Sequence, residues 1–215
     1  MKNNEFIDNL MEEHFEWRIK ELALIKKIYL KLRTENEKKF FLQTTIPIIY
    51  AIWEGFIKNT LSSLFEFLDN KEISSDKIKD TLLVLVLEDK INDIQQSKDF
   101  KKRVKHSSLL IKKLKSKIKF SNIKINTKSN LDDKTLLEIC FKVGLNSDNF
   151  DKNILNQLRK LVRDRNIISH GEKNGIVIKD INKVEEYISL IRELMDNFIL
   201  AIDEFINEEN YLLKE

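Results

Sequence analysis

The sequence contains few of the residues that make tight turns. It has one proline and four glycines among 215 residues. Turn-rich β architectures need more of both, so their scarcity favours long helices. Apolar residues form 42% of the chain and charged residues 34%, which suits amphipathic helices around a buried core and argues against disorder. A chain of this length fits one domain, and we therefore predict a single all-α domain over residues 1–215.

Cysteine, targeting signals and long apolar runs are also scarce. The single cysteine, Cys140, excludes an internal disulfide, and its apolar neighbours predict a buried position. The N-terminal residues lack the apolar segment of a signal peptide, and the longest apolar stretches are too short for a bilayer span. We expect a cytoplasmic protein that binds no membrane. No set of thiols or histidines has metal-ligand spacing, so we expect no metal and no cofactor.

Apolar residues recur at intervals of three and four along most of the chain, which is the spacing of amphipathic helices. Residues 117–130 and 171–179 break this pattern, and each could form short strands, a small β-hairpin or an irregular insert. Gly144 is placed to close one of the helices. The pattern predicts an N-terminal helix within 1–36, at about 4–35, and further helices at about 39–69, 76–89, 94–116, 132–143, 152–169 and from about 180 onward.

The segment between Lys98 and Lys119 is strongly basic. It contains ten lysines and arginines and one acidic residue, Asp99. Such a field attracts a nucleic-acid backbone without reading its sequence. The segment could equally be a solvated lysine-rich helix, because it has few aromatic residues for base stacking. Four of its residues are candidate RNA contacts, namely Lys101, Lys102, Arg103 and Lys105.

The predicted helix 152–169 carries the residues best suited to chemistry. Arg159, Arg163, Asn166 and His170 are spaced by four, three and four residues and so share one face, which Arg165 flanks. Arginine offers a planar fork of donors to phosphate oxygens. Histidine can exchange a proton with a ribose 2′-hydroxyl near neutral pH. The set suits metal-free transesterification of RNA, with Arg159 and Arg163 as additional RNA contacts.

The same residues also have a purely structural interpretation. A histidine in the last turn before Gly171 makes a good C-terminal cap, and arginines on a polar face are commonly just solvated. Glu54 lies on a largely apolar helix, where a carboxylate needs a partner. It either supports the site by orienting Arg165 or His170, or forms an ion pair with another basic residue.

Three segments together resemble one family. The segment Arg165–Gly171 resembles the Arg-Asn-x-x-x-His-Gly form of the Arg/His motif of HEPN-superfamily ribonucleases. The segment Tyr50–Lys58, with Trp-Glu-Gly at its centre, is similar to the upstream helix of the MAE-type branch. Ser129-Asn130-Leu131 and the helix after it are similar to the segment that precedes the motif there. The resemblance covers residues from about 40 to 200.

This resemblance implies an up-and-down helical bundle that forms a homodimer, with the two Arg/His motifs in one composite cleft. Active members of the family cut RNA without metal and leave a 2′,3′-cyclic phosphate and a 5′-hydroxyl. By position, Arg165 would steady the phosphate and its transition-state charge. His170 would be the general acid or base, and Asn166 would orient one of the two.

Two functions follow from these observations. The first is a HEPN-type endoribonuclease that acts on RNA as a toxin or effector of bacterial antiviral defence, restrained by an antitoxin or another defence-system protein. The alternative is a non-catalytic HEPN module, an interaction or nucleic-acid-binding subunit of a defence complex. A DNA-binding module rests only on the lysine run and lacks a recognition-helix signature. The first requires Arg165 and His170 to be open to solvent across a two-fold axis, whereas a His170 buried and bonded to backbone within its own subunit would favour the alternative.

Overall fold

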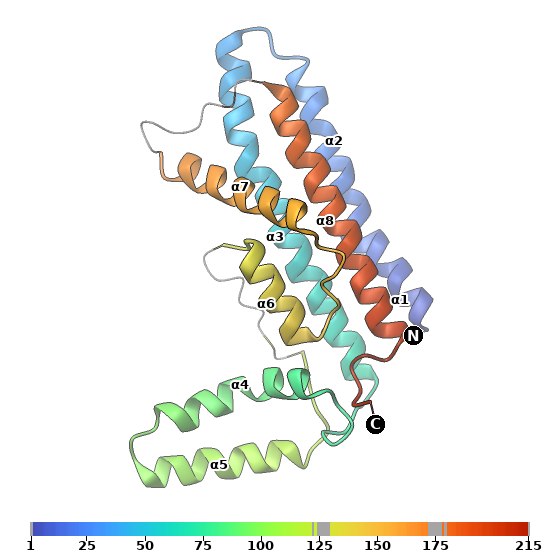
Figure 1. Cartoon of the computed structure of the whole chain (residues 1–215), viewed down its shortest axis with the longest axis vertical. Coiled ribbons are helices and arrows are strands. Elements are labelled where there is room, and N and C mark those ends of the chain that lie inside the picture. The colour runs from blue at the N-terminus through green and yellow to red at the C-terminus, as the bar shows by residue number, and fades with distance from the viewer. Residues whose placement is uncertain (1, 122, 124–129, 172–177, 179, 215) are drawn as a thin grey trace.

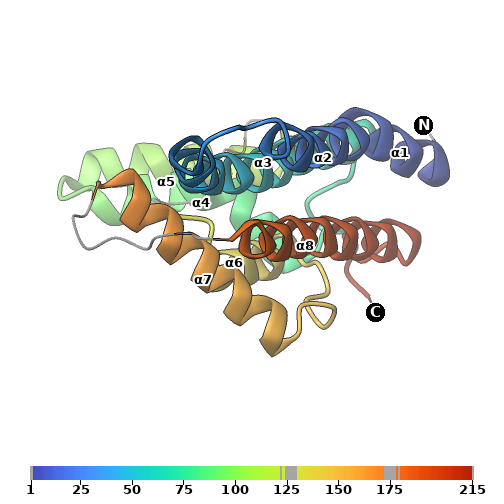
Figure 2. The same ribbon diagram turned by 90° about the horizontal axis from the view of Figure 1, so that it is seen from above.

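Three long helical segments run side by side and form the body of the protein (Figures 1 and 2). They are the N-terminal segment, α3 (Glu35–Asn70) and α8 (Ile181–Asn207). The described residues contain no β-strand, so the predicted all-α bundle is confirmed. The computed structural model describes residues 2–121, 123, 130–171, 178 and 180–214.

The N-terminal segment comprises α1 (Asn3–Leu10), a π-helical stretch (Met11–Glu16) and α2 (Trp17–Tyr29). It ends at Tyr29, six residues before the predicted end near 35. The reason lies at the start of α3, where Thr34 and Glu37 form a reciprocal capping box. The Thr34 hydroxyl accepts from the Glu37 amide at 3.2 Å, and the Glu37 carboxylate accepts from the Thr34 amide at 2.9 Å. The chain therefore turns before residue 34.

The core joins these three segments through aromatic rings. Phe56 of α3 lies 6.4 Å from Phe15, 6.3 Å from Trp53 and 6.2 Å from Phe198, measured between ring centroids. Such pairs add about 0.5–1.5 kcal/mol each beyond their buried area. Pro47 lies inside α3, which continues through it to Asn70. The central apolar stripe of α3 is buried throughout, at Leu42, Ile46, Ile49, Trp53, Phe56, Thr60, Leu64 and Phe67.

The composition of α3 bears on membrane binding. Among the described helices, α3 alone is long and apolar enough to cross a bilayer, with a mean hydropathy of 1.3 over its most apolar window. The sequence analysis expected no stretch long enough for a bilayer span, and α3 meets that criterion by length and composition alone. Half of that window is buried inside the protein, as in the core helix of a soluble bundle.

Of two shorter helices, α7 (Lys152–Ser169) packs against α3, and α6 (Asp133–Val143) packs against α7 and α4. The Asp132 carboxylate caps α6 by accepting from the Thr135 amide at 2.9 Å, and Gly144 ends it with φ 86°. Cys140 is buried as predicted, and this burial raises its pKa to about 12. The ends of α7 match the prediction, and the helix crosses α3 and α8 obliquely (Figure 1).

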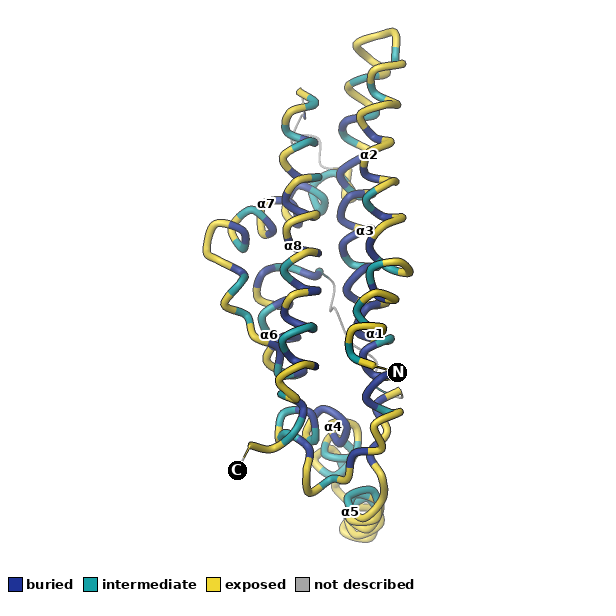
Figure 3. Tube along the Cα trace, turned by 90° about the vertical axis from the view of Figure 1, so that its right-hand side faces the viewer, coloured by how far each residue is buried: buried dark blue, intermediate teal, exposed yellow. Residues whose placement is uncertain are grey.

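The helices α4 (Asp80–Gln96) and α5 (Phe100–Leu114) form a hairpin that projects from one end of the bundle (Figure 1). Figure 3 shows α5 as mainly exposed, and none of its residues is buried. Both helices begin later than the predicted residues 76 and 94. The Asp99 carboxylate sets the start of α5, because it accepts from the Lys101 amide at 2.7 Å.

The segment after α5 behaves as its alternating sequence suggests, although its described part forms no strand. Ile118 and Phe120 are buried, whereas Lys117 and Lys119 are exposed. The Asp69 carboxylate accepts from the Phe120 amide at 2.5 Å, which ties this segment to the end of α3. Residues 122, 124–129, 172–177 and 179 lie outside the described residues, and they include most of the possible hairpin at 171–179.

Candidate active site

His170 lies at the C-terminal end of α7 and is exposed to solvent. Its backbone amide donates to the Asn166 carbonyl at 2.9 Å, and Gly171 then leaves the helix with φ 63°. Only glycine adopts this left-handed conformation readily. Within the described part of the chain, the imidazole makes no hydrogen bond and no ion pair, so its nitrogens are open to a ligand.

Arg165, one turn earlier, is half-buried and fixed on two sides. Its guanidinium carbon lies 4.0 Å from the centre of the Tyr50 ring of α3, in a cation–π contact. One terminal nitrogen, Nη1, donates to the Asn166 side-chain oxygen at 2.7 Å. The sequence analysis expected Asn166 to orient either Arg165 or His170, and of these two its side chain contacts Arg165. The helix end holds a fixed guanidinium and an open imidazole.

Glu54 lies on α3, one helical turn after Tyr50. Its carboxylate accepts from Lys58 at 2.8 Å, which is the ion pair that the second interpretation of Glu54 expected. Burial is the main cause that raises the pKa of Tyr50, and the negative charge of Glu54 raises it further. The field of Glu54 thus reaches the ring on which Arg165 lies, while its role as an orienter of Arg165 or His170 stays a prediction.

Arg159 and Arg163 are each paired with an acidic residue. Arg159 binds both carboxylate oxygens of buried Asp133, one of them from Nε at 3.1 Å, and so joins α7 to the start of α6. This bond to Arg159 holds the pKa of Asp133 below its usual value. Arg163 donates from Nη2 to Asp164 at 3.1 Å. Both arginine side chains remain more than half exposed, and contact with RNA stays a prediction for them.

Asp164 is a buried carboxylate directly before Arg165. Its second oxygen accepts from the Tyr187 hydroxyl of α8 at 2.6 Å, and burial together with this bond strongly raises the pKa of Tyr187. The pair fastens α7 to α8 beside the candidate site. The sequence analysis missed it, although an acid beside the apolar residues Leu161 and Val162 was a signal that a buried partner exists.

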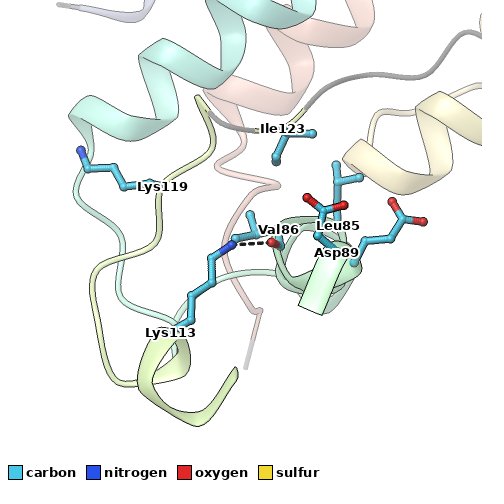
Figure 4. Close-up of a pocket in the computed structure, with 7 residues that line it drawn as sticks. Leu85, Val86, Asp89, Lys113, Lys119 and Ile123 are labelled. Atoms are coloured by element: carbon cyan, nitrogen blue, oxygen red, sulfur yellow. Dashed lines mark hydrogen bonds between the residues drawn. The ribbon is translucent and has the colours of Figure 1, made fainter. Parts of the chain in front are cut away.

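The four basic candidates of α5 are exposed and lie away from α7 (Figures 1 and 3). One copy of the chain thus presents them on a different surface from Arg165 and His170. Lys113 belongs to the same basic segment but is partly buried. It donates to the Val86 carbonyl at 2.7 Å, and burial lowers its pKa. It lines a pocket of about 270 Å³ between α4 and the segment after α5 (Figure 4).

The other two histidines lie elsewhere in the fold. The His14 ring is 2.8 Å from the Ser63 hydroxyl, and His106 lies 3.7 Å from Asp93. In the described residues, no three His, Cys, Asp or Glu side chains gather as metal ligands would. Of the three histidines, His170 is therefore the one at the arginine-rich end of α7.

Comparison with known proteins adds to this geometry. The sequence profile described as MAE_28990-like HEPN matches residues 7–211, which include the long helices and the whole of α7. No curated protein and no solved structure matched the chain. HEPN domains are often ribonucleases or parts of defence systems. Because the match spans nearly all of the sequence, the chain belongs to the MAE_28990-like HEPN family.

Proposed function

We propose that the protein is a metal-independent endoribonuclease, acting in the cytoplasm as a toxin or effector of bacterial defence. The observation that carries the proposal is the end of α7, where a guanidinium fixed by Tyr50 and Asn166 stands one turn before the solvent-open His170. These are the two groups that phosphodiester cleavage needs: a cation for the phosphate and an exchangeable proton.

The reaction uses the ribose 2′-hydroxyl as nucleophile. His170 removes its proton, the 2′-oxygen attacks phosphorus, and a new P–O2′ bond forms as the P–O5′ bond breaks. The leaving 5′-oxygen takes a proton from an imidazolium, so the products are a 2′,3′-cyclic phosphate and a 5′-hydroxyl. Arg165 donates to the non-bridging oxygens, where negative charge grows in the transition state.

This chemistry is the reason to propose a homodimer. The reaction requires a base at the 2′-oxygen and an acid at the 5′-oxygen, and the end of α7 offers one histidine per chain. If two copies place these ends around one phosphate, His170 acts as base and His170 of the partner subunit acts as acid. The exposed Lys101, Lys102 and Arg103 of α5 would hold the RNA beyond the cleft through its backbone charge.

A second candidate function is a non-catalytic HEPN subunit that binds a protein of a defence system. The ion pairs of α7 favour it, because they offset positive charge that would otherwise attract RNA. Asp133 and Asp164 offset the charges of Arg159 and Arg163, which leaves Arg165 as the arginine of this face without a carboxylate among its described contacts. A site that only binds protein needs no open imidazole, so activity of His170 distinguishes the two functions.

The test is cleavage of an end-labelled RNA by purified protein in the presence of a chelator. The wild type should cut, and its products should carry 2′,3′-cyclic phosphate ends. His170→Ala should lose cleavage by at least about 10²-fold, the range for removal of a general acid or base. His106→Ala makes the same chemical change on α5 and should retain wild-type activity. Cleavage by His170→Ala at the wild-type rate would contradict the proposal.

A further inference from the structure

We propose that Tyr50 is a positioning residue that holds Arg165 for catalysis, an inference that rests on the proposed function. The phenol ring comes from α3 and lies beneath the guanidinium, with 4.0 Å between the guanidinium carbon and the ring centre. Tyr50 itself is 2% exposed, so the ring belongs to the rigid core rather than to the surface. It gives Arg165 a support that α7 alone does not supply.

The hydroxyl of Tyr50 fixes the ring in turn. It accepts a hydrogen bond from the Leu131 amide at 2.6 Å, and Leu131 is fully buried next to the N-cap of α6. The ring is thus held by α3 at one end and by the entry to α6 at the other. These two attachments fix the position of the ring's long axis, and close packing around the buried ring keeps its face toward the cation.

This anchoring matters because a free arginine samples many rotamers. Asn166 binds only Nη1, so it restrains one corner of the guanidinium and leaves rotation about the remaining bonds. The Tyr50 ring is a second contact, 4.0 Å from the guanidinium carbon. Two contacts leave the group fewer orientations than one does, and a displacement of about 1 Å at such a group can cost about 10²-fold in rate.

Glu54 contributes to the same support through its charge. It follows Tyr50 by one turn, and its carboxylate raises the pKa of the phenol. Burial raises this pKa more than Glu54 does, and a tyrosine is in any case neutral near pH 7, so the ring beneath the cation carries no charge. In this arrangement the core helix α3 supplies the ring and a nearby negative charge, whereas α7 supplies the group that touches the phosphate.

The experiment compares substitutions at Tyr50 in two backgrounds. Tyr50→Leu removes the ring and should slow cleavage about tenfold or more with little change in KM, while Tyr50→Phe keeps the ring and should retain most activity. In an Arg165→Ala background, Tyr50→Leu should cause no further loss, because Tyr50 acts through Arg165. An equal loss in both backgrounds, or a wild-type rate for Tyr50→Leu, would overturn the inference.

A second series covers the case in which Tyr50→Leu does not fold. Phenylalanine analogues with increasing numbers of ring fluorines at position 50 keep the shape but weaken the attraction for a cation. The cleavage rate should fall stepwise along the series while the melting temperature changes little. A constant rate would overturn the inference alone, whereas absence of cleavage by the wild type would overturn the proposed function and this inference with it.

Discussion

Two basic surfaces of the protein look alike in sequence and differ in structure. Along α7, each of three arginines has a partner: Asp133 for Arg159, Asp164 for Arg163, and Tyr50 with Asn166 for Arg165. On α5, the candidate cations extend into solvent from a helix without buried residues. Fixed cations can stabilise a defined charge in a transition state, whereas solvated cations attract any polyanion and are screened by salt.

The largest expected effect comes from breaking the fixed geometry while keeping the charge. Arg165→Lys should reduce the cleavage rate about 10²-fold, because an ammonium cannot reproduce the planar fork or its stacking on Tyr50. Single-turnover rates with a short RNA measure this. Arg163→Lys is the matched control on the same helix and should lose far less. Similar losses for both would show that α7, like α5, contributes charge without geometry.

The next effect tests whether Arg159 serves the fold rather than RNA. Asp133→Asn should destabilise the protein by about 1–3 kcal/mol at neutral pH, since hydrogen bonds to a charged partner are lost. Denaturant midpoints of the wild type and the variant measure this difference. Asp148→Asn, on the exposed loop between α6 and α7, is the control and should change little.

The pH dependence of this pair has a defined sign. Arg159 lowers the pKa of Asp133 in the folded state, so the pair stabilises the fold above the unfolded pKa of about 3.9. That contribution is lost as the pH falls through the lowered folded pKa. The stability gap between wild type and Asp133→Asn should therefore shrink on acidification. A gap that stays constant down to pH 2 would show that charge is not its cause.

A smaller effect is expected on α5. Replacing Lys101, Lys102, Arg103 and Lys105 together by Gln should weaken RNA binding about tenfold at physiological salt and reduce its salt dependence. Cleavage at saturating RNA should stay unchanged, because α5 lies away from α7. Filter binding over a range of salt concentrations separates the two quantities. A lower rate at saturation would place α5 within the active cleft.

The sequence predicted the elements whose signals are local. Helix α7 has the ends predicted at about 152 and 169, and they are fixed locally: the Asp151 carboxylate accepts from the Ile154 amide at 2.8 Å, and Gly171 ends the helix. The break between α4 and α5 was misplaced because apolar spacing continues across it. The interruption depends on two side chains: the Ser97 hydroxyl donates to the Asp93 carbonyl at 2.7 Å, and Asp99 caps the next helix.

The candidate site was only partly predictable for a similar reason. Spacing on one helix put Asn166 and His170 on one face with Arg165 beside it, and in the structure Arg165 contacts Asn166 at the end of α7, while the catalytic roles of all three stay predictions. It could not pair Arg165 with Tyr50, because these residues are far apart in the sequence and meet only through packing of α7 on α3. Helical spacing also gave no reason to pair Arg163 with the adjacent Asp164, since consecutive residues of a helix point in different directions. The contact forms because the long Arg163 side chain bends back to the carboxylate.

The smallest effects concern two glycines, and they should have opposite signs. Gly171→Ala forces an L side chain into φ 63° at the end of α7 and should cost about 1–2 kcal/mol. Gly55→Ala lies inside α3, where the new methyl group would lie 3.6 Å from Arg18, an ordinary contact, and it should stabilise the protein by about 0.5–1 kcal/mol. Thermal unfolding of both variants tests this.

The same two variants also test catalysis. If the rigid end of α7 positions His170, Gly171→Ala should slow cleavage and Gly55→Ala should not. Unchanged cleavage by a destabilised Gly171→Ala would mean that His170 does not need a rigid helix end. Its exact position would then matter as little as that of the solvated lysines of α5.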